Sequence, residues 1–189
     1  MITKTLSSGK EIIIIDNLFK PADCMYFETF ANKCNYTLKG SVSAQNSSRS
    51  DNELFFGADL SRDDMTRFRL FDNQEFKNIN FRFNNLVVLR SWILCTEPST
   101  KYLYHPDHLA ETSLTFLYYL NGFWHPEWGG ETLFCDDNGE PELAVMCKPN
   151  RAVIFPSCVF HKPSGTSRDS KLRFTFTTTF VKNEPPPNV

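Results

Sequence analysis

The second half of this 189-residue chain divides into short β-rich runs separated by turn residues. Turn signals such as Asn121–Gly122, Gly129–Gly130 and Asn138–Gly139 lie between the runs. The runs cover residues 86–95, 102–105, 113–120, 131–134, 143–148, 152–155 and 173–181. Many short strands at this spacing predict an all-β sandwich or a rolled barrel for this half of the chain.

The first half predicts a strand and two helices that support this β structure. Residues 11–15 are rich in isoleucine and predict a strand. Pro21 opens a segment whose apolar residues recur at helical spacing up to Cys34. Residues 63–83 carry a second helical pattern, and the polar residues 40–51 predict a loop that is a candidate lid. We expect a single domain, with residues 1–85 supporting a β core at 86–181 and a proline-rich tail at 182–189.

Charge and hydropathy exclude several classes of protein. The net charge is −2 and the sequence pI is about 6.1, with no dense tract of lysine or arginine, so we expect no nucleic-acid partner. The apolar stretch at residues 12–15 ends at Asp16, too early for a signal peptide or a membrane span. We therefore expect a soluble, cytoplasmic protein with no membrane partner. Six cysteines without a Cys-x-x-Cys pair favour reduced thiols, although their even number leaves disulfides open.

Four residues suggest a metal site beside an anion site. On an extended strand, His105 and Asp107 would point to the same face, because side chains alternate along a strand. His161 follows another strand, and a rolled sheet could bring it across to complete a facial triad of metal ligands with open coordination positions. Arg173 begins a further strand, and a buried guanidinium there requires an anionic partner such as a carboxylate. Taken together, these residue types predict a redox-active metal next to a dicarboxylic acid.

The order of motifs resembles that of a known enzyme family. The likeness rests on residues 115–121 (Thr-Phe-Leu-Tyr-Tyr-Leu-Asn), 128–132 (Trp-Gly-Gly-Glu-Thr) and 149–155, followed by His161 and Arg173. This series resembles the 2-oxoglutarate and Fe(II)-dependent oxygenase superfamily, and within it the prolyl 4-hydroxylase-like branch of small single-domain bacterial and viral members. The resemblance covers residues 86–181. It implies a mainly β, α+β fold, a double-stranded β-helix or jelly roll, with supporting N-terminal helices.

The resemblance also implies roles for particular residues. His105, Asp107 and His161 would be the iron ligands, Arg173 would pair with the C5 carboxylate of 2-oxoglutarate, and Tyr119 would hydrogen-bond the same group. The implied cofactors are Fe(II), 2-oxoglutarate as cosubstrate and O2, with ascorbate as a candidate reductant.

One position departs from the family pattern. Many relatives have a tyrosine ten residues before the first iron ligand, where this chain has Cys95, so Tyr102 or Tyr104 is the candidate replacement for that phenol. His108 and His125 lie near the predicted site, but we expect neither to be a ligand.

The resemblance implies that the chain is an oxidoreductase, a dioxygenase that hydroxylates a substrate C–H bond and releases succinate and CO2. A prolyl residue in a peptide or protein is the leading substrate. A free amino acid or another small molecule is the alternative within the same enzyme class, and a metal-free jelly-roll binding module is the alternative outside it. The oligomeric state stays open.

Overall fold

The computed structural model covers residues 1–189 and describes residues 1–39, 55–67, 77, 86–98, 102–136, 138–167 and 171–182. Its elements are mostly short strands. In chain order they are β1 (Ile2–Thr5), β2 (Glu11–Asp16), α1 (Pro21–Lys33), β3 (Thr37–Lys39), β4 (Phe55–Asp59), α2 (Arg62–Arg67), β5 (Leu86–Thr96), β6 (Leu114–Tyr119), the 3-10 helix η2 (Pro126–Trp128), β7 (Thr132–Cys135), β8 (Pro141–Val145), β9 (Arg151–Pro156), β10 (His161–Pro163) and β11 (Arg173–Lys182).

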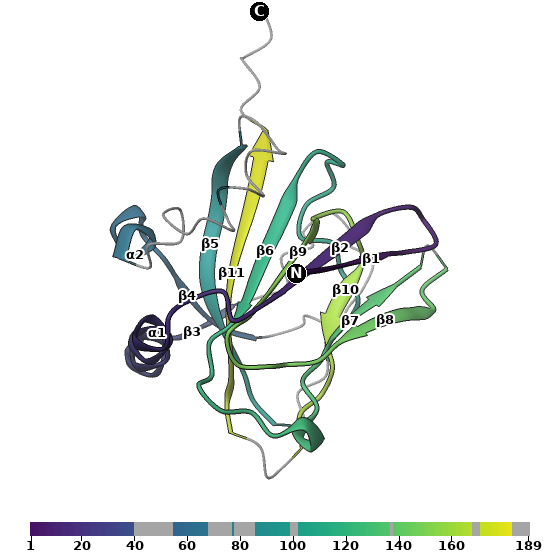
Figure 1. The fold of residues 1–189 in the computed structure, drawn as a ribbon. Coiled ribbons are helices and arrows are strands. Elements are labelled where there is room, and N and C mark those ends of the chain that lie inside the picture. Colours follow the sequence, from purple (N-terminus) through teal and green to yellow (C-terminus); the bar gives the residue numbers. More distant parts are fainter. Residues whose placement is uncertain are drawn as a thin grey trace, which may run out of the picture.

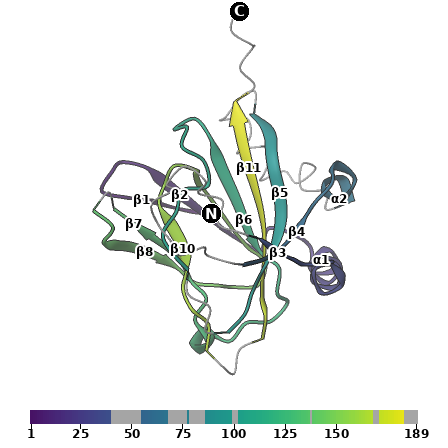
Figure 2. The same ribbon diagram turned by 180° about the vertical axis from the view of Figure 1, so that it is seen from behind.

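The strands form two antiparallel sheets. The larger has eight strands in the order β1-β2-β9-β6-β11-β5-β4-β3, and the smaller has three in the order β10-β7-β8. Helices α1 and α2 lie on one side of the large sheet and the small sheet lies on the other (Figure 1), which the view from behind shows equally well (Figure 2). The middle of the large sheet is therefore covered on both faces.

Because both faces are covered, the central strands β6 and β11 are buried along nearly their whole length. Every residue of β6 is buried. Phe116 of this strand joins the core cluster that contains Phe27 of α1, whereas the next residue, Leu117, joins the cluster that contains Phe134 of the small sheet. Successive side chains on a strand point to opposite faces, so β6 contributes to two cores at once.

The predictions for the first half of the chain are confirmed where the structure describes it. The strand expected at residues 11–15 is β2, and the helix expected from Pro21 is α1, which buries Phe27 and Ala31. Of the helix expected at residues 63–83, the structure describes α2 and Lys77, and the rest lies outside the described residues. The candidate lid at residues 40–51 also lies outside them.

One predicted strand is wrong. Residues 102–104 have no regular structure, and His105 makes only an isolated β-bridge. The other predicted strands of the second half are present as β5, β6, β7, β8, β9 and β11. The turn residues Gly129, Gly130 and Gly139 have φ of +71°, +79° and +85°, a backbone region that favours glycine.

All six cysteines are free thiols. Among the described residues, the helices are too short and too polar to cross a membrane.

Candidate metal centre

His105 and His161 face each other across an isolated antiparallel β-bridge. The backbone N–H of each residue donates to the carbonyl of the other, at 3.0 Å in both directions. Directly opposed residues of an antiparallel pair carry their side chains on the same face, so the two imidazoles lie side by side with ring centroids 5.0 Å apart. Pairing of β10 with β7 fixes His161, and through the bridge it also fixes His105.

Asp107 joins them by a route that the sequence reasoning did not predict. The chain bends after His105 instead of running on as a strand, and the N–H groups of Asp107 and His108 both donate to the carbonyl of Ser157, at 2.9 and 3.2 Å. This bend directs the Asp107 carboxylate toward His161, with Oδ2 3.5 Å from Nε2. The expected convergence is present, but strand alternation is the wrong reason for it.

The candidate ligand atoms of His105, Asp107 and His161 all lie within 4.8 Å of one another. Nδ1 of His105 lies 3.0 Å from the carbonyl of Leu103, and Nδ1 of His161 lies 3.0 Å from the carbonyl of Val159. A carbonyl can only accept, so each Nδ1 carries the proton and each Nε2 keeps a free lone pair. Histidines that bind metals are commonly oriented in this way by a hydrogen bond from the other ring nitrogen.

Burial and neighbouring charges set the protonation of this group. Burial lowers the pKa of His161 to about 4, even though the nearby Asp107 carboxylate favours its charged form. Burial alone would raise the pKa of Asp107, but His161, His105, Arg90 and a hydrogen bond from Thr115 outweigh it, so that pKa lies below its usual value. At neutral pH, His161 is a neutral donor and Asp107 is an anion, as ligands of a divalent cation must be.

A pocket runs from this triad to Arg173. Its lining residues come from β4, β5, β6, β7, β10, β11 and residues 102–107: Phe55, Trp92, Leu94, Cys95, Thr96, Tyr102, His105, Asp107, Leu117, Thr132, His161, Pro163, Arg173, Thr175 and Thr177. Arg173 is 2% exposed. Its Nε donates to the Gly130 carbonyl at 2.8 Å and its Nη2 to Thr132 Oγ1 at 3.4 Å, and among the described residues no carboxylate pairs with it. A buried guanidinium without a carboxylate suits an anionic ligand.

Gly130 allows Arg173 to lie this close to the backbone. A Cβ at this position would be 3.0 Å from Cδ of Arg173 and 3.1 Å from Cγ2 of Thr166. The sequence prediction that Gly129–Gly130 permits a tight turn is confirmed by their positive φ values. The glycine pair thus makes both the turn and the seat for the arginine.

Tyr119 reaches the pocket only through its neighbours. It is fully buried, its hydroxyl lies 2.8 Å from Thr132 Oγ1 and 3.2 Å from the Val145 carbonyl, and the Arg173 guanidinium lies 5.1 Å from the centre of its ring. Thr132 itself lines the pocket. Sequence reasoning missed Thr132, although it ends the Trp-Gly-Gly-Glu-Thr motif, because the motif alone does not say which of its side chains faces inward.

The two candidate phenols are placed differently. Tyr102 lines the pocket together with Cys95, whereas Tyr104 is not among the lining residues and packs under the Lys162 ammonium, 4.4 Å from its ring centre. Of the two tyrosines, Tyr102 is therefore the one positioned to contact a bound molecule.

Two other histidines lie apart from the cluster. His108 Nδ1 accepts from the N–H of Ala110, and His125 Nδ1 accepts from the N–H of Glu127 at the start of η2. In the part of the chain that the structure describes, the only group of potential metal ligands is His105, Asp107 and His161. His108 and His125 therefore lie outside this group of candidate ligands.

The residues of the pocket fit a divalent metal ion beside an anion. Two imidazole lone pairs and one ionised carboxylate are the donors of a facial triad. On β11, between Arg173 and the triad, Thr177 is 4% exposed and its hydroxyl has no partner, which is unusual for a buried polar group. An oxygen-rich ligand between the triad and Arg173 would satisfy both this hydroxyl and the guanidinium.

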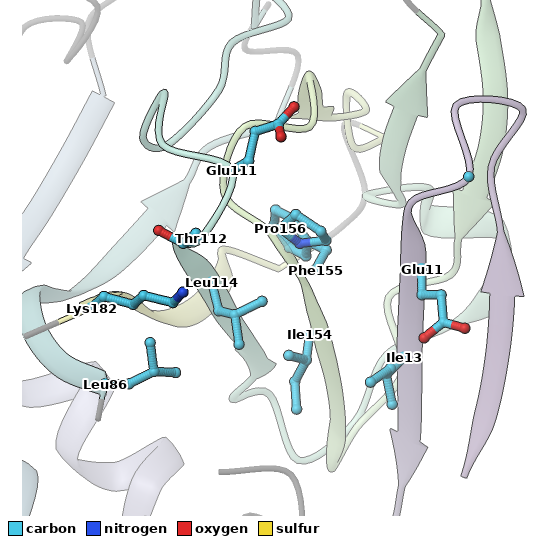
Figure 3. A pocket seen from close by; sticks show the side chains of 11 residues that line it. Glu11, Ile13, Leu86, Glu111, Thr112, Leu114, Ile154, Phe155, Pro156 and Lys182 are labelled. Carbon is cyan, nitrogen blue, oxygen red and sulfur yellow. The ribbon is translucent and has the colours of Figure 1, made fainter. Parts of the chain in front are cut away.

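A second hollow, of about 670 Å3, lies elsewhere on the large sheet (Figure 3). Its floor is apolar, from Ile13, Leu114 and Ile154, and the charged side chains of Glu11, Glu111 and Lys182 also line it. It shares no lining residue with the pocket of the triad.

Comparison with known proteins agrees with the site. Residues 91–180 match the family model described as "2OG-Fe(II) oxygenase superfamily". No curated protein matches the sequence. Solved structures with the same fold include a Pseudomonas putida prolyl-4-hydroxylase, at 15% identity and a TM-score of 0.63, with 92% of this chain and 93% of that chain covered.

Two other solved structures carry informative ligands. A Trichoplax adhaerens prolyl hydroxylase in complex with a hypoxia inducible factor peptide has 15% identity and a TM-score of 0.62, covering 89% of this chain and 82% of that chain. HygX from Streptomyces hygroscopicus, with nickel and 2-oxoglutarate bound, has 11% identity and a TM-score of 0.62, covering 91% and 83%.

These likenesses confirm the predicted double-stranded β-helix fold. The family model over residues 91–180 and the cluster of two histidines and an aspartate make the chain similar to the 2OG-Fe(II) oxygenase superfamily.

Proposed function

We propose that this protein is a 2-oxoglutarate-dependent oxygenase that hydroxylates a prolyl residue in a peptide or protein. The observation that carries the proposal is the single pocket that joins the His105, Asp107 and His161 cluster to the buried, carboxylate-free guanidinium of Arg173. Its two ends carry the groups that would hold an iron ion and the far carboxylate of 2-oxoglutarate. Fe(II), when bound, supplies the oxidative chemistry in which 2-oxoglutarate and O2 become succinate and CO2 and one oxygen atom enters a C–H bond.

The protein residues would divide the work as follows. His105, Asp107 and His161 hold the metal, and their open side faces the pocket. Arg173 and the Thr132 hydroxyl receive the C5 carboxylate, and Tyr119 supports Thr132 from beneath. The guanidinium is already fixed by the Gly130 carbonyl, so little reorganisation is needed when the carboxylate arrives.

The remaining wall of the pocket suits an apolar ring. Phe55 and Trp92 form an edge-to-face pair with ring centroids 5.7 Å apart, and Leu94 and Pro163 extend the apolar surface. A pyrrolidine ring could pack against this surface. Two of the structurally similar proteins are prolyl hydroxylases, and one of them is in complex with a peptide, which supports a peptide or protein as the substrate.

A hydroxylase of small molecules is the second candidate. It is favoured by a structural neighbour of the same fold, HygX, which is also known with hygromycin B bound. A metal-free binding module is the weaker alternative, because it would have no use for two free imidazole lone pairs beside an ionised carboxylate. Under either enzymatic proposal, ascorbate is a candidate reductant for the iron.

An anaerobic titration with Fe(II) and 2-oxoglutarate tests the cofactor assignment. Chelation of ferrous iron by 2-oxoglutarate gives a weak visible charge-transfer band, which should require both components and be absent in Asp107→Ala. Proline-containing peptides and free amino acids are then compared by succinate release and by the gain of one oxygen atom in the product. Hydroxylation of a free amino acid or other small molecule, with none of any peptide, would refute the prolyl proposal and favour the second candidate.

A further inference from the structure

We infer that Arg90 is a positioning residue that holds Asp107 so that only one of its carboxylate oxygens can bind the metal, which rests on the proposed function of the triad. Monodentate binding matters because a carboxylate that binds through both oxygens takes a second coordination position. A facial triad keeps its open positions for cosubstrate and oxygen. Arg90 would thus protect one of them.

The two oxygens of Asp107 have different surroundings. Oδ1 accepts a hydrogen bond from Nη2 of Arg90 at 3.2 Å. Oδ2 accepts one from Thr115 Oγ1 at 2.7 Å and lies 3.5 Å from Nε2 of His161. Only Oδ2 is directed toward the second imidazole. Turning the carboxylate so that both oxygens face a common metal would break the bond to Arg90.

Arg90 is itself held in place from several directions. The same Nη2 donates to the backbone carbonyl of Asp107 at 2.8 Å, and Nε lies 3.3 Å from Thr179 Oγ1, to which it donates. The guanidinium carbon lies 4.5 Å from the ring centre of Trp92, two residues along the same strand. Because one nitrogen bonds both the main chain and the side chain of Asp107, it fixes the carboxylate relative to its own backbone.

The chemistry of arginine suits this role. The guanidinium is planar and rigid, so it can contact Asp107, Thr179 and Trp92 at once, whereas a lysine would present one flexible charge. Opposite Arg90 on β11 is Thr179, and the β5–β11 register shifts just after it, between Thr179 and Phe180. Such irregularities re-aim side chains at the edge of a functional site.

Replacing Arg90 with methionine tests the inference by two binding measurements that do not depend on turnover. In Arg90→Met, Asp107 is free to bind through both oxygens. The affinity for Co(II), measured by calorimetry, should therefore stay within about threefold of wild type or rise. The affinity of the Co(II) protein for 2-oxoglutarate, measured from the cobalt visible spectrum, should fall by about tenfold, the lower end of the loss typical of residues behind the metal ligands.

Arg151→Met is the matched control. Arg151 donates from Nε to Asp16 at 2.6 Å in an arginine–aspartate pair that does not line the pocket. Arg151→Met should change neither the affinity for Co(II) nor the affinity for 2-oxoglutarate. Arg90→Lys should bind 2-oxoglutarate more tightly than Arg90→Met, but should recover less than half of the lost affinity on a logarithmic scale. A lysine cannot make the planar contacts of the guanidinium.

The outcomes separate the inference from the function on which it rests. If wild type binds Co(II) and 2-oxoglutarate and Arg90→Met binds both equally well, the inference is wrong. It is also wrong if Arg90→Met loses Co(II) affinity as severely as Asp107→Ala does, since Arg90 would then only support the ligand set. Failure of wild type to bind either component would overturn the proposed function and the inference together.

Discussion

Replacing Arg173 with methionine should remove cosubstrate binding with little effect on the stability of the ligand-free protein. Arg173 is 2% exposed, and its guanidinium contacts the Gly130 carbonyl, the Thr132 hydroxyl and the Tyr119 ring, with no carboxylate partner among the described residues. Losing hydrogen bonds from a charged donor costs about 1.5–3 kcal/mol each. Removing a buried charge with no counter-ion recovers several kcal/mol of desolvation. The two effects nearly offset, so the free energy of unfolding should change by less than about 2 kcal/mol.

The effect on ligand binding should be much larger. Removing the guanidinium from a buried pair with a ligand carboxylate costs about 3–5 kcal/mol of binding free energy. Because 1.4 kcal/mol corresponds to a factor of ten, the Kd for 2-oxoglutarate should rise by about 100-fold or more. A small change in the free energy of unfolding together with a large loss of 2-oxoglutarate affinity would distinguish a ligand anchor from a structural residue.

Thermal unfolding in the presence of Mn(II) measures both quantities. At 2-oxoglutarate concentrations 100 times the wild-type Kd, binding stabilises the folded state by about 2.7 kcal/mol. For a chain of this size, that corresponds to a rise in Tm of roughly 5–11 °C. Wild type and Arg151→Met should show the rise and Arg173→Met should not. A full rise in Arg173→Met would refute Arg173 as the carboxylate anchor.

Three further predictions follow from the same geometry. Gly130→Ala should lower both Tm and the affinity for 2-oxoglutarate, because the new Cβ would press on Arg173. Gly139 has a similar positive φ but no atom within 4 Å of a new Cβ, so Gly139→Ala should lower Tm alone. Equal 2-oxoglutarate affinities in the two variants would contradict this prediction. His161→Ala should abolish 2-oxoglutarate turnover and metal binding while the far-ultraviolet circular dichroism stays that of wild type, and turnover at the wild-type rate would sink the ligand assignment. Asp16→Asn should lower the free energy of unfolding by at most about 1 kcal/mol at neutral pH, because the pair is partly exposed. Hydrogen bonding to its basic partners lowers the folded-state pKa of Asp16 to about 2, below the unfolded value, so the difference between wild type and variant should shrink as the pH falls from 4 to 2 in acid-unfolding curves.

The strands were predictable where burial and turn chemistry agree. Residues 113–120 are almost continuously apolar and end at Asn121–Gly122, and they form β6 within two residues of the expected limits. Short elements escaped prediction because long-range pairing makes them. β3 pairs with β4, about twenty residues further along the chain, and β10 pairs with β7, about thirty residues before it. The sequence of a short strand does not predict a pairing partner that lies far away along the chain.

The site was predictable in its residue types but less so in its geometry. His105, Asp107 and His161 were identified from the order of motifs, yet the bend that aims Asp107 depends on the carbonyl of Ser157, about fifty residues further along the chain. Thr132 lines the pocket because it lies on the face of β7 that points inward, which its sequence motif does not specify. Arg90 was not singled out from the sequence either, because an arginine on a predicted strand usually reaches solvent.

The division of β11 between its two faces connects the fold with the chemistry. Arg173, Thr175 and Thr177 alternate along this strand and line the pocket, while Phe174 and Phe176 between them enter the core beneath α1. Packing of the phenylalanines on one face of β11 thus fixes the positions of the polar side chains on the other face, which follow one another at every second residue. The same arrangement buries a guanidinium and an unpartnered hydroxyl, which a protein selected for stability alone would replace with apolar side chains. An anionic, oxygen-rich ligand would pair with the guanidinium and the hydroxyl and so offset the desolvation cost of burying them. The polar face of β11 therefore favours binding of such a ligand.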